Sequence, residues 1–117
     1  MSSAGVYAGS DHWPLDENSP TDPKSRHAGK ADTEAWLTAE GVPFTSFRPT
    51  YIYGPGNYNP IERWFFDRIV HEQPVPLPGD GTTITQLGHV DDLAEAMARC
   101  IDVDAAANRI YNCSGKQ

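Results

Sequence analysis

Basic side chains gather in one short segment of an otherwise acidic chain. The 117 residues carry 9 Lys and Arg against 16 Asp and Glu, a formal net charge of −7. The basic residues of the segment are Lys24, Arg26, His27 and Lys30. They could bind a cofactor phosphate or an RNA phosphate, pair with Asp22 and Glu34, or form an ordinary solvated helix face. Because an acidic chain repels phosphate backbones, nucleic-acid binding would require a local basic patch of this kind.

Aromatic residues that follow this cluster are candidate stacking surfaces for nucleic-acid bases. They are Tyr51, Tyr53, Tyr58, Trp64, Phe65 and Phe66. Trp64 and Phe65 fall on the apolar stripe of an expected helix and are predicted to be core. Tyr58 and Asn59 lie in an expected loop and are the better candidates for an exposed contact.

One histidine precedes two adjacent carboxylates, His89 before Asp91 and Asp92. The carboxylates could hold a divalent ion, but acidic residues are also favoured at a helix N-terminus, which is the interpretation preferred here. We therefore predict no metal site. Cys100 and Cys113 lack a C-x-x-C pattern or a His at metal spacing, so we expect reduced, buried thiols.

The elements that must position these residues alternate between strand and helix. Residues 1–7 have the pattern of a strand end that opens into a loop over 8–22. Asp22 followed by Pro23 predicts a helix start, and Gly41 predicts its end. The remaining patterns indicate strands over 42–48, 84–88 and 109–113, a loop over 54–60, and helices over 61–72 and from 91 onward. This order is typical of α/β folds with parallel strands.

Length and hydropathy limit the alternatives. A chain of 117 residues holds a single domain at most. No apolar run approaches the ~20 residues needed to cross a bilayer, and residues 1–3 do not begin a signal peptide. We therefore expect no membrane partner.

Several strings, in the right order, resemble the extended short-chain dehydrogenase/reductase family, the NAD-dependent epimerase/dehydratase group. They are residues 2–7 (SSAGVY), Lys30 with Glu34, Arg48-Pro49 with Tyr53-Gly54-Pro55, Gly79-Asp80-Gly81, and residues 89–94 (HVDDLA). Residues 22–30, 51–68 and 84–94 are in addition similar to the chloroplast stem-loop-binding branch and its cyanobacterial relatives, which are RNA-associated. The resemblance implies an α/β fold, namely a partial Rossmann-like parallel sheet with part of the small substrate domain.

The family's catalytic set is a Ser or Thr, a Tyr and a Lys. Ser3 matches the first position and Lys30 the third, but the Tyr position, four residues before Lys30, holds Arg26. Arg stays charged and cannot accept a proton. If both residues lie on one helix, a guanidinium replaces the phenol, and His27 would lie about 100° around that helix. Dehydrogenase or epimerase turnover is therefore not expected.

The resemblance also implies cofactor and substrate contacts. NAD(P) would be contacted by Lys30, Pro49 and Tyr51, although no G-x-x-G-x-x-G sequence occurs in the chain, so this part of the protein need not bind it. In the family an Arg that binds the substrate diphosphate usually follows Gly-Asp-Gly. In this chain Thr85 lies near the position expected for that Arg. Substrate or RNA contacts are predicted at Lys24, Arg26, His27, Tyr58, Asn59 and His89.

Three hypotheses follow. The first is that residues 1–117 are one fragment of an atypical family member that binds RNA. The second is an active NAD-dependent nucleotide-sugar epimerase or dehydratase, and the third is a truncated chain without independent activity, because its sheet would lack partner strands. The resemblance further implies a plastid stroma or cyanobacterial cytoplasm, and a homo-oligomer or complex for the intact protein.

Overall fold

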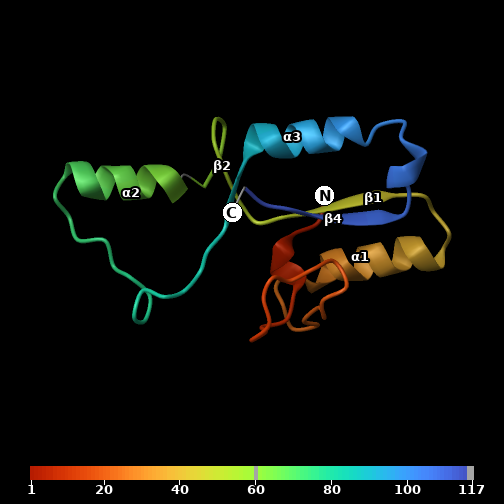
Figure 1. Ribbon diagram of the computed structural model, residues 1–117, viewed down its shortest axis with the longest axis horizontal. Helices are drawn as coiled ribbons and strands as arrows, with labels where there is room; N and C mark the ends of the chain where they lie inside the picture. The colour runs from red at the N-terminus through yellow and green to blue at the C-terminus, as the bar shows by residue number, and fades with distance from the viewer. Residues whose placement is uncertain (60, 116–117) are drawn as a thin grey trace.

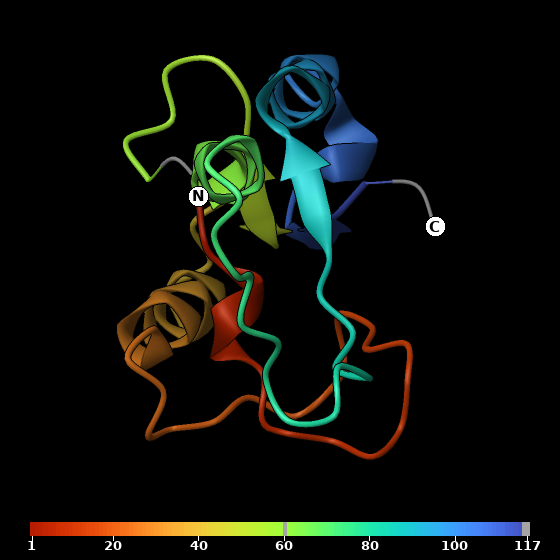
Figure 2. The ribbon, with the colours of Figure 1, turned by 90° about the vertical axis from the view of Figure 1, so that its left-hand side faces the viewer.

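A parallel pair of strands forms the centre of the molecule. The computed structural model describes residues 1–59 and 61–115. Strand β1 (Thr45–Pro49) runs parallel to β4 (Arg109–Cys113), with Ser46 opposite Ile110. Helix α1 (Ala28–Ala39) lies on one side of this pair and α3 (Val90–Arg99) on the other (Figures 1 and 2). The predicted α/β arrangement with parallel strands is confirmed.

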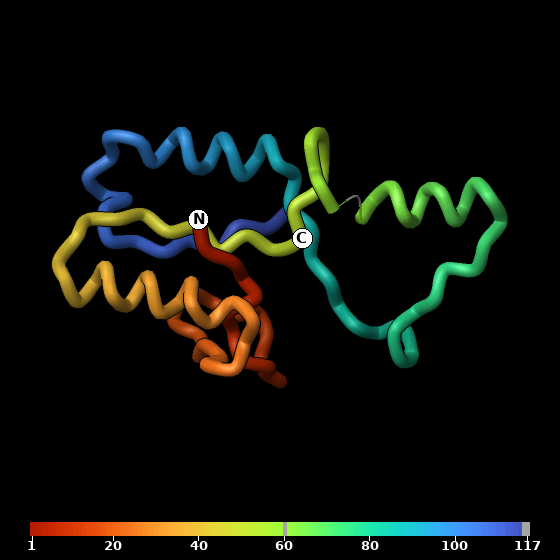
Figure 3. The backbone as a smooth tube through the Cα atoms, turned by 180° about the vertical axis from the view of Figure 1, so that it is seen from behind, coloured from red at the N-terminus to blue at the C-terminus, as the bar shows by residue number. Residues whose placement is uncertain are grey.

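A smaller unit extends from the carboxyl end of β1. Strand β2 (Tyr51–Tyr53) pairs in parallel with β3 (Leu87–His89), and Ile52 stands opposite Gly88. Helix α2 (Ile61–Val70) projects away from the three layers, and an irregular segment returns from it to β3 (Figure 3). The predicted loop over 54–60 is confirmed for 54–59, and residue 60 lies outside the described residues.

The first helix begins later than its sequence predicts. Asp22 does not cap it: its Oδ1 accepts a hydrogen bond from the Lys24 N–H at 2.8 Å, and its carbonyl accepts one from the Ser25 N–H at 3.0 Å. Residues 22–27 therefore form turns, because an Asp-Pro pair initiates a turn as readily as a helix. The predicted end is correct, since Gly41 adopts φ 65° and closes a Schellman motif through the Val42 N–H bond to the Leu37 carbonyl.

Other predicted bounds differ from the structure. The strand predicted over 84–88 is found at Leu87–His89, and the helix predicted over 61–72 ends at Val70. Residues 4–6 form a short 3₁₀ helix, η1 (Ala4–Val6), in place of a strand end. β1 covers Thr45–Pro49, whereas the sequence predicted a strand over 42–48. The final strand matches its prediction, and a second 3₁₀ helix, η2 (Asp104–Ala106), precedes it.

The molecule is open, and its apolar core is small. Val6, Phe47, Leu93 and Ala106 form the buried apolar core, and Pro49 of β1 is also buried. The accessible surface is 8930 Å², against about 6,300 Å² for a compact protein of this mass. The radius of gyration is 16.5 Å, against about 13 Å for a compact chain of this length. No described helix is long and apolar enough to cross a membrane.

Two burial predictions were wrong. Trp64 and Phe65 on α2 are 41% and 43% exposed, and α2 has no buried residue. The apolar stripe exists, but α2 projects from the layers and no described element covers that stripe. Cys100 and Cys113 are free thiols, as predicted, although each is only half-buried.

A buried ion pair joins α1 to β1. The Arg48 guanidinium bonds the Glu34 carboxylate at 2.5 Å, and both side chains are at most 7% exposed. The Ser46 hydroxyl donates to the same carboxylate at 2.6 Å. Burial alone would raise the pKa of Glu34, but the hydrogen bonds from Arg48 and Ser46 outweigh it, so this pKa lies below its ordinary value.

The pair extends into a polar network that reaches the N-terminal loop. Arg48 donates to the Tyr7 hydroxyl at 2.9 Å, and Tyr7 donates to the Asn112 side chain at 2.6 Å. The Asn112 N–H bonds the Glu17 carboxylate at 2.6 Å. α1, both central strands and the loop over 8–22 are therefore tied to one buried cation.

Replacing Glu34 tests this network. Glu34→Gln leaves the buried Arg48 charge without its anion and should cost about 3 kcal/mol of unfolding free energy at pH 7, measured by urea denaturation. Because the pKa of Glu34 is lowered by folding, the difference from wild type should be complete above the ordinary value of 4.5 and shrink as pH falls below it.

The matched control is Glu95→Gln. Glu95 pairs with Arg99 at 2.5 Å, but their side chains are 61% and 77% exposed, so the cost should stay under about 1 kcal/mol. Equal losses in the two variants would contradict the assignment of the Glu34 pair as the main polar support of the fold.

Candidate functional site

Ser3 and Lys30, the residues predicted for the first and third catalytic positions, lie where η1 approaches α1. Ser3 caps η1, and its Oγ accepts a hydrogen bond from the Gly5 N–H at 3.1 Å. The Lys30 Nζ donates to the carbonyl of Ser2 at 3.1 Å, and the Ser2 N–H bonds the Phe47 carbonyl of β1 at 2.7 Å. The structure therefore brings Ser3 and Lys30 to one place, which we call the η1–α1 corner: Ser3, Gly5, Arg26, His27 and Lys30.

The imidazole of His27 packs on Gly5. A Cβ atom added to Gly5 would stand 2.5 Å from His27 Cδ2, 3.0 Å from its Nε2 and 3.3 Å from Ser3 Oγ. Ser25 fixes this approach, because its hydroxyl donates to the Gly5 carbonyl at 2.6 Å and accepts from the His27 N–H at 3.1 Å. Sequence alone does not single out Gly5 or Ser25, since only the folded chain brings their segments together.

His27 and Arg26 are not helical, which corrects two predictions. His27 occupies the N-cap position of α1, and Arg26 precedes it in the turn. Arg26 and Lys30 are therefore not a helical pair four residues apart, and His27 is not displaced around a shared helix. Instead, the Arg26 Nε donates a hydrogen bond to His27 Nε2 at 3.1 Å.

Two tyrosines of the family-like strings, Tyr7 and Tyr53, have other partners. The Tyr7 hydroxyl is held between Arg48 and Asn112. The ring of Tyr53 contacts His89 edge-on, with centroids 5.0 Å apart. Among residues 1–59 and 61–115, neither of these two side chains forms a hydrogen bond with Lys30, so neither supplies the missing phenol there.

His89 has a structural role. It caps α3, where its Nδ1 accepts a hydrogen bond from the Asp91 N–H at 3.2 Å. Asp91 and Asp92 occupy the first turn of α3 and are exposed, as the helix-start interpretation predicted. Their carboxylates complement the positive end of the helix dipole.

The loop after β2 presents an exposed tyrosine. Asn57 orders this loop, because its side chain donates to the Ile52 carbonyl at 2.9 Å and accepts from the Asn59 N–H at 3.1 Å. Tyr58 is 99% exposed, as predicted. The loop lies on the α3 side of the sheet, whereas η1 lies on the α1 side (Figure 1). The structure therefore does not bring Tyr58 and Asn59 to the η1–α1 corner.

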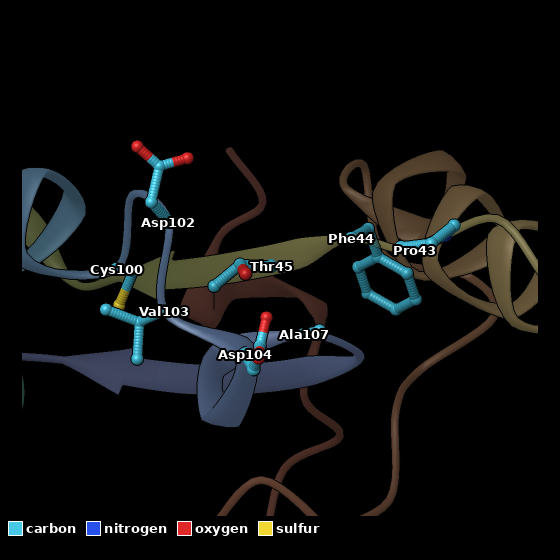
Figure 4. A pocket seen from close by; sticks show the side chains of 8 residues that line it. All are labelled: Pro43, Phe44, Thr45, Cys100, Asp102, Val103, Asp104 and Ala107. Carbon is cyan, nitrogen blue, oxygen red and sulfur yellow. The ribbon is translucent and has the colours of Figure 1, made fainter.

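Two surface hollows of the described residues lie away from the η1–α1 corner. The first, of about 280 Å³, lies at the start of β1 beside the turn that follows α3 (Figure 4). Its lining is Pro43, Phe44, Thr45, Cys100, Asp102, Val103, Asp104 and Ala107. The second, of about 260 Å³, lies at the carboxyl ends of β1 and β4 and includes Pro49, His89 and Cys113. Burial raises the pKa of Cys113, which disfavours a reactive thiolate there.

The residues predicted to contact the cofactor and the substrate form only part of a binding site. Pro49 is buried in β1, while Tyr51 is 56% exposed. Asp80 accepts hydrogen bonds from the Thr82 hydroxyl and N–H, which lower the pKa of Asp80, and Thr85 is exposed. No Gly-rich loop is present to receive a pyrophosphate, so these residues do not fit a complete NAD cradle.

The parallel strands, with helices on both sides, define an α/β protein (Figure 1). The model of the NAD dependent epimerase/dehydratase family matches residues 1–114. The chain belongs to this family, as its sequence motifs suggested.

Individual relatives agree with this assignment. The chain is 52% identical over 116 residues to the chloroplast stem-loop binding protein of 41 kDa b from Arabidopsis thaliana, covering 99% of the chain and 31% of that protein. It also resembles dTDP-glucose 4,6-dehydratase from Bacillus anthracis, with TM-score 0.76, 23% identity, and coverage of 99% and 39%.

DesIV, the dTDP-glucose 4,6-dehydratase of Streptomyces venezuelae, solved as a double mutant with NAD and DAU bound, gives TM-score 0.75 and 26% identity, with coverage of 99% and 38%. The chain therefore spans about a third of the curated relative and about two fifths of these structures. What it matches is one part of a longer fold.

Replacing Gly5 tests the packing of the η1–α1 corner. Gly5→Ala places a methyl group within 2.5 Å of the His27 ring and should displace the imidazole, which the side-chain resonances of His27 in an NMR spectrum would report. Gly9→Ala is the matched control, because a Cβ there meets no atom within 4 Å. Unchanged His27 resonances in Gly5→Ala would contradict the described contact.

Proposed function

We propose that this chain is part of an RNA-binding member of the family that has lost dehydrogenase chemistry. The observation that carries the proposal is Arg26, which stands in the phenol position of the catalytic motif and bonds His27. The proposed RNA contacts are Lys24, Arg26, His27 and Lys30 at the η1–α1 corner and its preceding turn, with Tyr58 and Asn59 as a second contact.

The proposed loss of dehydrogenase activity follows from which side chains can transfer a proton. The family reaction needs a phenol that can give and take a proton beside the Lys30 amine. Arg26 has no accessible neutral form. The Tyr7 hydroxyl is committed to Arg48 and Asn112, and that network supports the fold.

Charge supports phosphate binding. Lys24, Arg26 and Lys30 are three of the nine Lys and Arg residues, and no acidic residue interrupts residues 24–30. All three are exposed, and none forms an ion pair with a carboxylate in residues 1–59 or 61–115. Cations beside a helix N-terminus oppose the helix dipole, so an anionic ligand would relieve their repulsion.

The relative's name supports the choice of ligand. The Arabidopsis protein is called a stem-loop binding protein, and it is chloroplastic. By this similarity we propose RNA as the partner and a plastid or cyanobacterial compartment as the location. The relatives are longer than this chain. We propose that NAD(P) binding and self-association would depend on the additional parts that such longer proteins contain.

Removing two cations of the cluster tests RNA binding. In filter binding of a labelled RNA stem-loop, log K should fall linearly with log salt concentration. Arg26→Ala/Lys30→Ala should weaken binding and reduce that slope by about 2, roughly 1 per phosphate contact. The matched control is Arg63→Ala/Arg99→Ala, which removes the same charge from exposed ion pairs outside the cluster and should leave the slope unchanged.

The competing activity is nucleotide-sugar epimerisation, which is favoured by the hydrogen bond of Lys30 to Ser2, the residue before Ser3. NAD titration and an epimerisation assay with a nucleotide sugar measure it on the same preparation. Turnover of the sugar, or equal salt slopes in the two double variants, would contradict the RNA proposal.

Replacing Tyr58 tests the second contact. Tyr58→Ala removes an exposed ring without disturbing packing, and it should weaken RNA binding by about 1–3 kcal/mol if one base stacks there. Tyr58→Phe keeps the ring and should bind as wild type does. If Tyr58→Ala also binds as wild type does, the loop is not an RNA contact.

A further inference from the structure

The edge of β1 that faces away from β4 lies beside the start of the chain. Main-chain groups of successive strand residues point to opposite edges. The Thr50 N–H, just after β1, bonds the Cys113 carbonyl of β4 at 3.0 Å, whereas the Phe47 carbonyl accepts from the Ser2 N–H at 2.7 Å. Position 49, like position 47, therefore directs its main chain toward Ser2.

Pro49 leaves one carbonyl of this pairing without its expected partner. In a parallel ladder, a residue whose N–H bonds the carbonyl of position 47 gives its own carbonyl to the N–H of position 49. Proline has no N–H, so Pro49 cannot bond the Ser2 carbonyl. Ser2 is only 4% exposed, and a buried carbonyl without a donor is costly. The Lys30 Nζ supplies the donor at 3.1 Å.

We propose that Pro49 positions the Lys30 ammonium in the η1–α1 corner and that this placement serves the phosphate contact, the second part resting on the proposed RNA binding. The ammonium carries three N–H donors. Within residues 1–59 and 61–115 the Ser2 carbonyl takes one of them, so two remain for a phosphate oxygen. Because Lys30 is ordered before the RNA arrives, its side chain loses less freedom on binding.

Carboxylates do not take the place of this carbonyl. Lys30 forms no ion pair with a carboxylate in the described ranges, 1–59 and 61–115. Glu34, one turn along α1, is buried and already paired with Arg48. Asp32 is exposed and lies about 200° around the helix from Lys30. The Ser2 carbonyl is therefore the group that holds the ammonium.

The test of the placement is a rescue experiment on the folded chain. Lys30→Met keeps the apolar stem but removes the ammonium, so the buried Ser2 carbonyl loses its donor. The unfolding equilibrium constant, measured by urea denaturation, should rise by about tenfold. Adding Pro49→Ala supplies an N–H at position 49 and should recover most of that loss. Pro43→Ala, at an exposed proline before β1, is the matched control and should recover none of it.

The affinity for an RNA stem-loop at fixed salt tests what the placement serves. In Pro49→Ala alone the new N–H bonds the Ser2 carbonyl, and Lys30 keeps its charge but loses its fixed position. Affinity should fall by about 2- to 10-fold, the cost of ordering one long side chain, while the salt slope stays as in wild type. In the Lys30→Met background Pro49→Ala should not change the affinity, because the two substitutions act on one contact.

The outcomes separate this inference from the proposed function. Absence of recovery in Lys30→Met/Pro49→Ala would overturn the placement by Pro49. Recovery of stability with unchanged RNA affinity in Pro49→Ala would support the placement and overturn its role in phosphate binding. Recovery without salt-dependent RNA binding in wild type would support the placement and overturn the proposed function. If the double variant fails to fold by circular dichroism, hydrogen exchange in Pro49→Ala decides: an unprotected amide at position 49 would overturn the placement, and a protected one would support it.

Discussion

The carboxylate of Glu34 and the guanidinium of Arg48 form the interaction on which the other contacts depend. Removing two charges from water is costly, and the pair is tolerated because Ser46 and Tyr7 satisfy further hydrogen-bonding positions. Through this pair α1 is fixed against β1. The start of α1 carries Lys30, and β1 carries the Phe47 carbonyl that holds Ser2, so the η1–α1 corner is positioned from both sides.

The same network explains how so small an apolar core supports a defined site. So few buried apolar side chains cannot order a loop that lies outside the layers. Polar contacts do so instead: the Glu17 carboxylate receives the Asn112 N–H, and its carbonyl receives Arg48 at 3.3 Å. The η1–α1 corner is thus held in place largely by hydrogen bonds and to a smaller extent by apolar packing.

Sequence reasoning predicted those features that depend on local pattern. The final strand, the Gly41 stop and the α3 start were all read correctly from a few neighbouring residues. The α1 start was not, because Asp22-Pro23 suits a turn and a helix equally. The exposure of Trp64 and Phe65 was missed since an apolar stripe says nothing about what covers it. At the site, Ser3 and Lys30 were placed together by motif, but the packing of His27 on Gly5 joins residues far apart in sequence and leaves no local trace.

The hydrogen bonds of the polar network are expected to form in an order set by how far apart their partners lie in the sequence. Glu34 and Arg48 are 14 residues apart, whereas Tyr7 and Asn112 are 105 apart. The entropy lost on closing a loop grows with its length, and contacts between distant residues slow folding. While the ribosome is still extending the chain, α1 and β1 can associate, and the bonds of the η1–α1 corner can form because they join residues 2–47. The bonds from Asn112 to Tyr7 and to the loop over 8–22 form only after β4 has been synthesised.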